Sequence, residues 1–166
     1  RGGALNVQTR RGCQFACSYC TYPMLEGGVS RPRDVARVVD GIERLHVERG
    51  TDHFFLVDNT FNVPPSHALA FCHELGRRKL VLQWTAYVTP AGLTREVVDA
   101  MSKAGCTSVD LGTDAATPAT LAGLRKSFTC REIESACDWL REAKIRFSHS
   151  LILGGPGESP QTLRET

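Results

Sequence analysis

The sequence lacks a long hydrophobic run and carries no marked excess of either charge. Its apolar stretches fall far short of the roughly 20 residues that a membrane-spanning helix needs, so we expect no membrane association. The net charge is +2, and the densest basic groups, within residues 31–37 and 77–79, contain no aromatic residues. Surfaces that bind nucleic acids combine clustered basic charge with aromatic side chains, and we therefore expect no nucleic-acid partner.

The seven cysteines do not form the pattern of a disulfide-stabilised secreted protein. Such proteins favour an even number of cysteines in a smaller, loop-rich chain, whereas this chain has seven in 166 residues. We therefore expect a reducing, cytoplasmic location. Four cysteines fall in predicted helices or at strand starts, where we expect small core residues: Cys72, Cys106, Cys130 and Cys137. The other three are crowded into one short stretch: Cys13, Cys17 and Cys20.

Short apolar runs that are typical of strands alternate along the chain with amphipathic stretches that are typical of helices. The predicted strands are residues 4–9, 52–58, 80–87, 107–113 and 145–153. The predicted helices are 35–46, 66–75, 95–104, a short turn near 117–124, a longer helix capped by Thr129 and Glu132, and one helix after residue 158. This alternation predicts an α/β fold with a parallel sheet and five β/α units, in a single domain over residues 1–166 that reads as part of a longer chain.

The alternation of side chains within the strands favours a barrel over an open, doubly wound sheet. Along most predicted strands every second residue is polar, so that the residues of one parity, which share one face, are repeatedly polar. This suits a wall that lines a cavity, whereas a sheet covered by helices on both faces is apolar on both faces. The strand at 52–58 departs from this pattern, with Phe on both parities. We expect Trp84, Val109 and Phe147 under helices, and His149 as a packed core histidine. The residues expected to point inward are Gln8, Gln83, Thr85, Tyr87, Ser108, Asp110, Ser148 and Ser150.

Cys13, Cys17 and Cys20 have the spacing C-x3-C-x2-C directly after the first predicted strand, where parallel α/β proteins build their sites. Three interpretations are open. A structural zinc ion needs a fourth ligand, and the nearest candidates, His46 and His53, lie beyond a helix. The thiols could carry no ligand at all. The third interpretation is a [4Fe–4S] cluster in which three thiolates hold three irons and leave the fourth iron open to another ligand, and we favour it.

The chain resembles the core of the radical S-adenosylmethionine enzymes. The family signature has three cysteines at this spacing with an aromatic residue before the third, here Tyr19 before Cys20. "FFLVDNTFN" (54–62), "AGCTSVDLGTDAA" (104–116) and "SLILGGPGES" (150–159) are similar to the segments of the family that meet the methionyl group, the ribose and the adenine. The resemblance spans essentially the whole chain. It implies a partial (β/α) barrel, with five of about six units present.

The resemblance also implies roles for particular residues. Cys13, Cys17 and Cys20 would hold the cluster. The family usually has Gly-Gly-Glu after its second strand and often Glu-Ser after its fourth, so Asp58 or Asn59 would meet the amino group here and Asp114 would meet the ribose. The residues expected around the bound S-adenosylmethionine are Tyr19, Asp58, Asn59, Asp114, Ser150, Gly154, Gly155 and Gly157. Tyr87 ends its strand on the inward parity, and we predict that it contacts substrate or cobalamin as the candidate catalytic residue.

The stretches "CTYPMLEGG" (20–28), "WTAYVTP" (84–90) and "LGTDAATPATLAGLRKSFT" (111–129) most resemble cobalamin-dependent methyltransferases of natural-product pathways. That resemblance implies an upstream cobalamin-binding domain, an external electron donor and a small-molecule substrate. Two alternatives are open: a cobalamin-independent enzyme of the same family, such as a methylthiotransferase or a rearrangement enzyme, or a non-catalytic iron–sulfur protein. The resemblance also implies the chemistry that the family shares, in which reductive cleavage of S-adenosylmethionine yields a deoxyadenosyl radical that abstracts hydrogen from the substrate. Methyl transfer by the tryptophan-methylating type of enzyme is thought not to need this radical.

Overall fold

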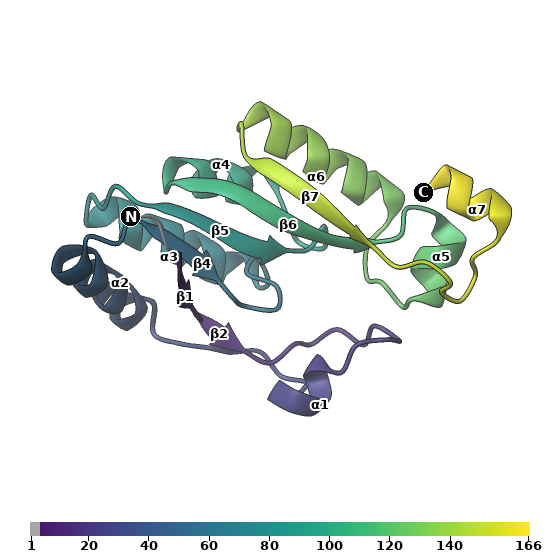
Figure 1. The fold of residues 1–166 in the computed structure, drawn as a ribbon, viewed down its shortest axis with the longest axis horizontal. Helices are drawn as coiled ribbons and strands as arrows, with labels where there is room; N and C mark the ends of the chain where they lie inside the picture. The colour runs from purple at the N-terminus through teal and green to yellow at the C-terminus, as the bar shows by residue number, and fades with distance from the viewer. Residues whose placement is uncertain (1–3) are drawn as a thin grey trace.

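The structure is a computed structural model that describes residues 4–166, and its centre is a five-stranded parallel sheet. The strands stand side by side in the order β1-β4-β5-β6-β7 (Figure 1). Their bounds are β1 Leu5–Val7, β4 His53–Leu56, β5 Gln83–Val88, β6 Cys106–Asp114 and β7 Arg146–Leu151. Sequential strands that lie next to one another and run parallel require a crossover between each pair, and this confirms the α/β fold and the five predicted β/α units.

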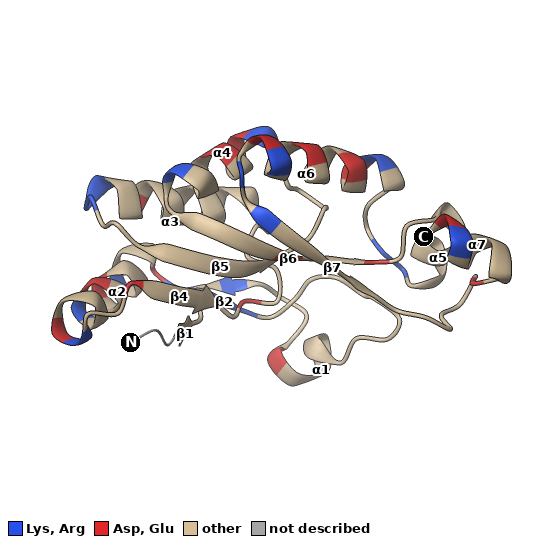
Figure 2. Ribbon diagram, turned by 45° about the horizontal axis from the view of Figure 1, so that its top comes forward, with Lys and Arg blue, Asp and Glu red and all other residues tan. Residues whose placement is uncertain are grey.

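Helices supply these crossovers and cover one face of the sheet. The larger ones are α2 Val35–Arg49, α3 Pro65–Arg77, α4 Arg95–Lys103 and α6 Cys130–Glu142. The shorter ones are α1 Tyr22–Glu26, α5 Pro118–Gly123 and α7 Pro160–Glu165. In Figure 1, α1 lies below the sheet, apart from α4 and α6. Figure 2 shows most charged residues on the helices, with the sheet itself largely uncharged. Among residues 4–166, none of these helices has the length and apolar character to cross a membrane.

The helix ends follow the signals in the sequence. The Thr94 hydroxyl accepts a hydrogen bond from the Val97 amide at the start of α4. At the start of α6, Thr129 and Glu132 form the predicted capping box, in which each side chain bonds the backbone of the other. Gly50 ends α2 with a φ of +63°, a left-handed conformation that costs glycine little.

The predicted alternation of faces is confirmed by burial. Trp84 and Val109 are each 1% exposed and lie in the core under the helices, and Phe147 packs against that core. At the alternate positions of β5, on the face away from the helices, Gln83 and Tyr87 are exposed. Hydrogen bonds connect the polar side chains of neighbouring strands: His53 Nε2 lies 3.3 Å from Thr85 Oγ1, which lies 3.1 Å from Ser108 Oγ. The polar face is therefore a continuous row across β4, β5 and β6.

Two expectations about the strands are wrong. The first strand ends at Val7 instead of residue 9, because the amides of Thr9 and Arg10 turn away to donate to the side chain of Asp58, which follows β4. His149 has the predicted parity but is exposed, so it is not a packed core histidine. Its Nδ1 lies 3.1 Å from Thr113 Oγ1 and its Nε2 lies 3.6 Å from Cys137 Sγ. The reason is that β7 is the edge strand of the described sheet, and residues 148–151 are all exposed.

Candidate active site at the cysteine loop

The cysteine loop, residues 12–21, begins after a short antiparallel pair formed by β2 Arg10–Arg11 and β3 Arg31–Pro32. Gly12 has a φ of +81°, and a Cβ at this position would lie 2.1 Å from the Val29 carbonyl oxygen, so only glycine fits. The Cys13 amide donates to the Gly27 carbonyl at 3.1 Å. At the far end of the loop, the Ser18 amide donates to the Leu124 carbonyl at 3.1 Å. The loop is thus held at both ends, beneath the carboxyl ends of the strands (Figure 1).

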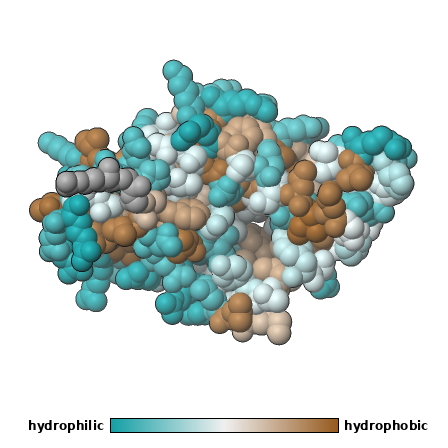
Figure 3. Space-filling model, viewed as in Figure 1, coloured by the Kyte–Doolittle hydropathy of each residue, from teal (hydrophilic) through white to brown (hydrophobic). Residues whose placement is uncertain are grey.

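A cavity of about 370 Å³ separates this loop from the ends of the strands. Its volume lies within the range of about 300–1,000 Å³ that is usual for small-molecule sites. In Figure 3 the surface is hollowed above α1. All three loop cysteines line the cavity, and Cys13 is the most buried, with 7% exposed. The other predicted site residues that line it are Tyr19, Asn59, Tyr87, Asp114 and Ser150. Residues from the ends of four strands therefore meet at one site, as the topology predicts.

The three loop cysteines fit a cluster better than they fit a single metal ion. All seven cysteines of the chain are free thiols. A structural zinc ion takes four Cys or His ligands, whereas the described residues that line the cavity include three cysteines and no histidine. In a [4Fe–4S] cube each thiolate binds a different iron, so the three sulfur atoms stand apart around a larger group. The cavity between loop and sheet offers space for that group.

Beside the cysteines lies a group of three polar side chains, two of which, Lys126 and Asp114, are buried. Tyr19 donates a hydrogen bond to the Asp114 carboxylate, and Lys126 forms an ion pair with the same oxygen. The side chains of Lys126 and Asp114 are only 7% and 9% exposed. Lys126 also lies over the Phe128 ring, 5.3 Å from its centroid, where a cation is favoured. Asp114 has a φ of +64°, a left-handed conformation that Asp tolerates better than most residues.

The protonation states of this group follow from burial and from its neighbours. Desolvation, and then the hydrogen bond to Asp114, raise the pKa of Tyr19 above its usual value, so the phenol stays neutral. Burial raises the pKa of the Cys17 thiol, while the positive charge of Lys126 opposes that shift.

Lys126 was not among the residues predicted from the sequence. It lies in the quoted stretch 111–129, but only the fold shows that it returns to the cavity.

Asp58 and Asn59, the two residues after β4 that were predicted to meet the methionyl amino group, have different surroundings. Asn59 lines the cavity, but Asp58 is 0% exposed and does not. One Asp58 carboxylate oxygen accepts from the backbone amides of Thr9 and Arg10 at 2.7 and 3.0 Å, and the other accepts from the Thr9 hydroxyl. Burial raises the pKa of Asp58, and these hydrogen bonds oppose the rise. Asp58 therefore has a structural role, because it fixes the end of β1 and the start of the cysteine loop.

The glycines after β7 lie beside α5. A Cβ on Gly157, whose φ is +83°, would lie 2.6 Å from the Ala119 carbonyl oxygen, and one on Gly155 would lie 3.2 Å from the Leu124 side chain. Gly154 has open space around it, and none of the three glycines lines the cavity. The close packing on α5 is a sufficient reason for glycine at residues 155 and 157, and the contact with adenine stays a prediction.

Tyr87 lies in the cavity on the polar face of the sheet. It is 41% exposed, and its ring packs against Phe55 with centroids 4.9 Å apart. Asp110, on the neighbouring strand, also lines the cavity and accepts a hydrogen bond from Ser148. Tyr87 and Asp110 are paired in register, so the cavity presents an aromatic ring and a carboxylate side by side.

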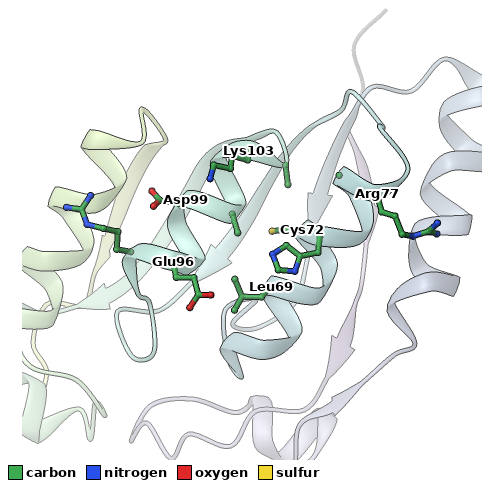
Figure 4. A pocket seen from close by; sticks show the side chains of 11 residues that line it. Leu69, Cys72, Arg77, Glu96, Asp99 and Lys103 are labelled. Carbon is green, nitrogen blue, oxygen red and sulfur yellow. The ribbon is translucent and has the colours of Figure 1, made fainter.

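A larger hollow of about 780 Å³ lies on the helical side of the sheet, between α3 and α4 (Figure 4). Figure 4 shows its walls, among them Leu69, Cys72, Glu96, Asp99 and Lys103. Burial raises the pKa of Cys72 to about 12, so this thiol is neutral and a poor metal ligand. The hollow is open and is separated by the sheet from the loop cysteines. We therefore place the active site in the smaller cavity.

Comparison with known proteins agrees with this geometry. A protein-family model described as the radical SAM superfamily matches residues 7–166. This chain belongs to the radical S-adenosylmethionine superfamily. A [4Fe–4S] cluster and S-adenosylmethionine are the cofactors that this membership implies.

Among curated relatives, the anaerobic magnesium-protoporphyrin IX monomethyl ester cyclase of Cereibacter sphaeroides is 34% identical over 94% of this chain and 26% of its own length. The tryptophan 2-C-methyltransferase of Streptomyces laurentii is 25% identical over 99% of this chain and 30% of its own. The radical S-adenosylmethionine methyltransferase TsrM of Kitasatospora setae, solved with cobalamin and a [4Fe–4S] cluster, is 29% identical with a TM-score of 0.92, over 99% of this chain and 31% of that one. The chain thus spans about a third or less of these relatives.

Proposed function

We propose that this chain is the catalytic core of a cobalamin-dependent radical S-adenosylmethionine methyltransferase that acts on a small molecule. The single observation that carries the proposal is the cavity in which Cys13, Cys17 and Cys20 face Asp114, Lys126 and Tyr87. The TM-score of 0.92 with a methyltransferase that binds cobalamin and a cluster supports the cobalamin-dependent branch. The seven free thiols support a reducing compartment, the cytoplasm.

The cavity offers complementary partners for the cluster and for the carboxylate, amino and ribose groups of S-adenosylmethionine. The three thiolates would hold the cluster, which supplies an open iron and single electrons when bound. Lys126 is the one cationic side chain among the described residues that line the cavity, and it suits the α-carboxylate. Asn59 has a neutral amide that suits the amino group beside it. Asp114, held by Tyr19 and Lys126, suits the ribose hydroxyls as an acceptor.

The substrate and cobalamin would approach from the polar face of the sheet. Tyr87 presents an exposed ring there, and Asp110 presents a carboxylate. A complete enzyme of this kind needs an upstream cobalamin-binding domain and an external electron donor, and both are part of the proposal. The second candidate is a cobalamin-independent enzyme, because a ribosomal protein uS12 methylthiotransferase of Nitratidesulfovibrio vulgaris is 32% identical over 90% of this chain.

The test follows the fate of S-adenosylmethionine. The full-length protein is reconstituted with iron and sulfide without oxygen, and is incubated with S-adenosylmethionine and a low-potential reductant, with and without cobalamin. We expect S-adenosylhomocysteine to form only when cobalamin is present. Formation of 5′-deoxyadenosine alone, equally with and without cobalamin, would favour the second candidate. No turnover and an unchanged EPR spectrum on adding S-adenosylmethionine would contradict both.

A further inference from the structure

Two neighbouring arginines at the start of the cysteine loop have opposite surroundings. Arg10 is 1% exposed and is among the largest fully buried side chains of the protein. Its Nη2 donates to the Gly12 carbonyl at 3.2 Å. Within the described part of the chain, its Nε and Nη1 are buried without any acceptor. Arg11 is exposed, and its Nε donates to Gln8 at 2.8 Å.

The nearest carboxylate does not satisfy the Arg10 guanidinium. Asp58 accepts from the Arg10 backbone amide and from Thr9, and no hydrogen bond joins its carboxylate to the Arg10 guanidinium. His67, the other titratable group of this buried cluster, bonds Thr9 Oγ1 at 2.8 Å and supplies no negative charge. Burial and the charge of Arg10 both lower the pKa of His67, which keeps it neutral. A buried guanidinium with two unpaired N–H groups is costly, and neither Asp58 nor His67 offsets that cost with a hydrogen bond to it.

The position of Arg10 in the chain indicates where that partner lies. Its side chain reaches the Gly12 carbonyl, and the residue after Gly12 is Cys13, the most buried of the three cluster cysteines. Burial lowers the pKa of Arg10, while the negative charges of Asp58 and of a Cys13 thiolate oppose that shift. Arginine stays protonated even when buried. A fixed positive charge with two N–H groups that have no acceptor therefore lies beside the peptide that joins Gly12 to Cys13, outside the residues that line the cavity.

We propose that Arg10 is a positioning residue that raises the reduction potential of the cluster by placing its guanidinium against the Cys13 side. This inference rests on the proposed function. Reduction adds one electron from an external low-potential donor to the cluster held by the three thiolates, and no bond forms or breaks. The added negative charge is stabilised by a buried cation and by N–H groups near the sulfur atoms, two factors that set the potentials of iron–sulfur clusters.

The test is an EPR-monitored redox titration of the reconstituted full-length protein. Arg10→Met removes the charge and keeps much of the volume, Arg10→Lys keeps the charge but not the planar group, and Arg11→Met is the matched control on the exposed neighbour. We expect Arg10→Met to make the reduction equilibrium constant at least tenfold less favourable, which lowers the midpoint potential by about 59 mV for one electron. The midpoint potential of Arg10→Lys should fall between those of Arg10→Met and the parent protein, and that of Arg11→Met should match the parent protein.

The inference is overturned if Arg10→Met keeps full iron content with an unchanged potential, or if Arg11→Met shifts the potential as much. If Arg10→Met fails to fold, the inference is tested on the parent protein instead. Labelled with ¹⁵N-arginine and reduced, it should show pulsed-EPR coupling of the cluster to ¹⁵N that Arg10→Lys removes. Absence of that coupling in the parent protein also overturns the inference. These outcomes leave the proposed function standing, because that function is tested separately, by the formation of S-adenosylhomocysteine in the presence of cobalamin.

Discussion

The two faces of the parallel sheet differ in chemistry while sharing the same strands. On the helical face, Trp84 packs between Phe61 and Phe71 with ring centroids 5.2 and 5.9 Å away, and its Nε1 donates to the Ala104 carbonyl at 2.8 Å. On the other face, residues one position away in the chain, Gln83 and Thr85, are exposed or half-buried and polar. The alternation of a strand thus lets one segment serve stability on one side and binding on the other.

The same division separates the cysteines. Cys72 and Cys106 are buried under the helical face, where burial raises the pKa of Cys72 to about 12 and raises that of Cys106 even further. Cys13, Cys17 and Cys20 lie across the sheet, in the cavity. Thiolates bind iron, so the two groups should respond differently to the same substitution.

The largest expected effect comes from the cysteines. Changing Cys13, Cys17 or Cys20 to Ala should remove most of the cluster iron after anaerobic reconstitution, because each thiolate holds its own iron. Cys72→Ala, on α3, should leave the iron content unchanged. Iron and sulfide assays with EPR measure both. A single loop variant that kept a full cluster responsive to S-adenosylmethionine would contradict the assignment.

The second-largest expected effect is on the free energy of unfolding, and it tests whether the helical face carries the stability of the sheet. Trp84→Ala should lower the free energy of unfolding by about 3–5 kcal/mol, because it leaves a cavity among packed aromatic rings and removes a buried hydrogen bond. Gln83→Ala, its neighbour on the polar face, should change the free energy by about 0.5 kcal/mol or less. Urea denaturation without oxygen measures the difference. Equal losses in the two variants would show that the faces do not divide stability in this way.

The smallest effect concerns binding at the polar face. Asp114→Asn should weaken S-adenosylmethionine binding by about 1–3 kcal/mol, because it replaces the charged acceptor proposed for the ribose hydroxyls with a neutral amide. Asn tolerates the left-handed backbone at this position, so the fold should persist. The control is Asp138→Asn, which breaks the exposed pair with Arg141 on α6. Calorimetric titration gives both affinities, and equal affinity in the two variants would remove Asp114 from the site.

Much of the fold and part of the site could be predicted from the sequence. The alternation of strands and helices gave the parallel sheet, and the parity of β5 and β6 gave the correct faces for Trp84, Tyr87 and Val109. The spacing of Cys13, Cys17 and Cys20 placed three thiols on one loop at the correct end of the sheet. These are local properties: strand periodicity, helix caps and loop spacing depend on residues close in the chain.

What the sequence by itself determined is therefore the order of the elements, the face of each strand residue and the cysteine loop. Only the tertiary structure placed the Asp58 carboxylate against backbone amides of a segment 48 and 49 residues away, and Asn59 at the cavity. Only it brought Lys126 to Asp114 and left His149 exposed at the edge strand. Parity tells which way a side chain points, but what it meets there is set by elements distant in the chain.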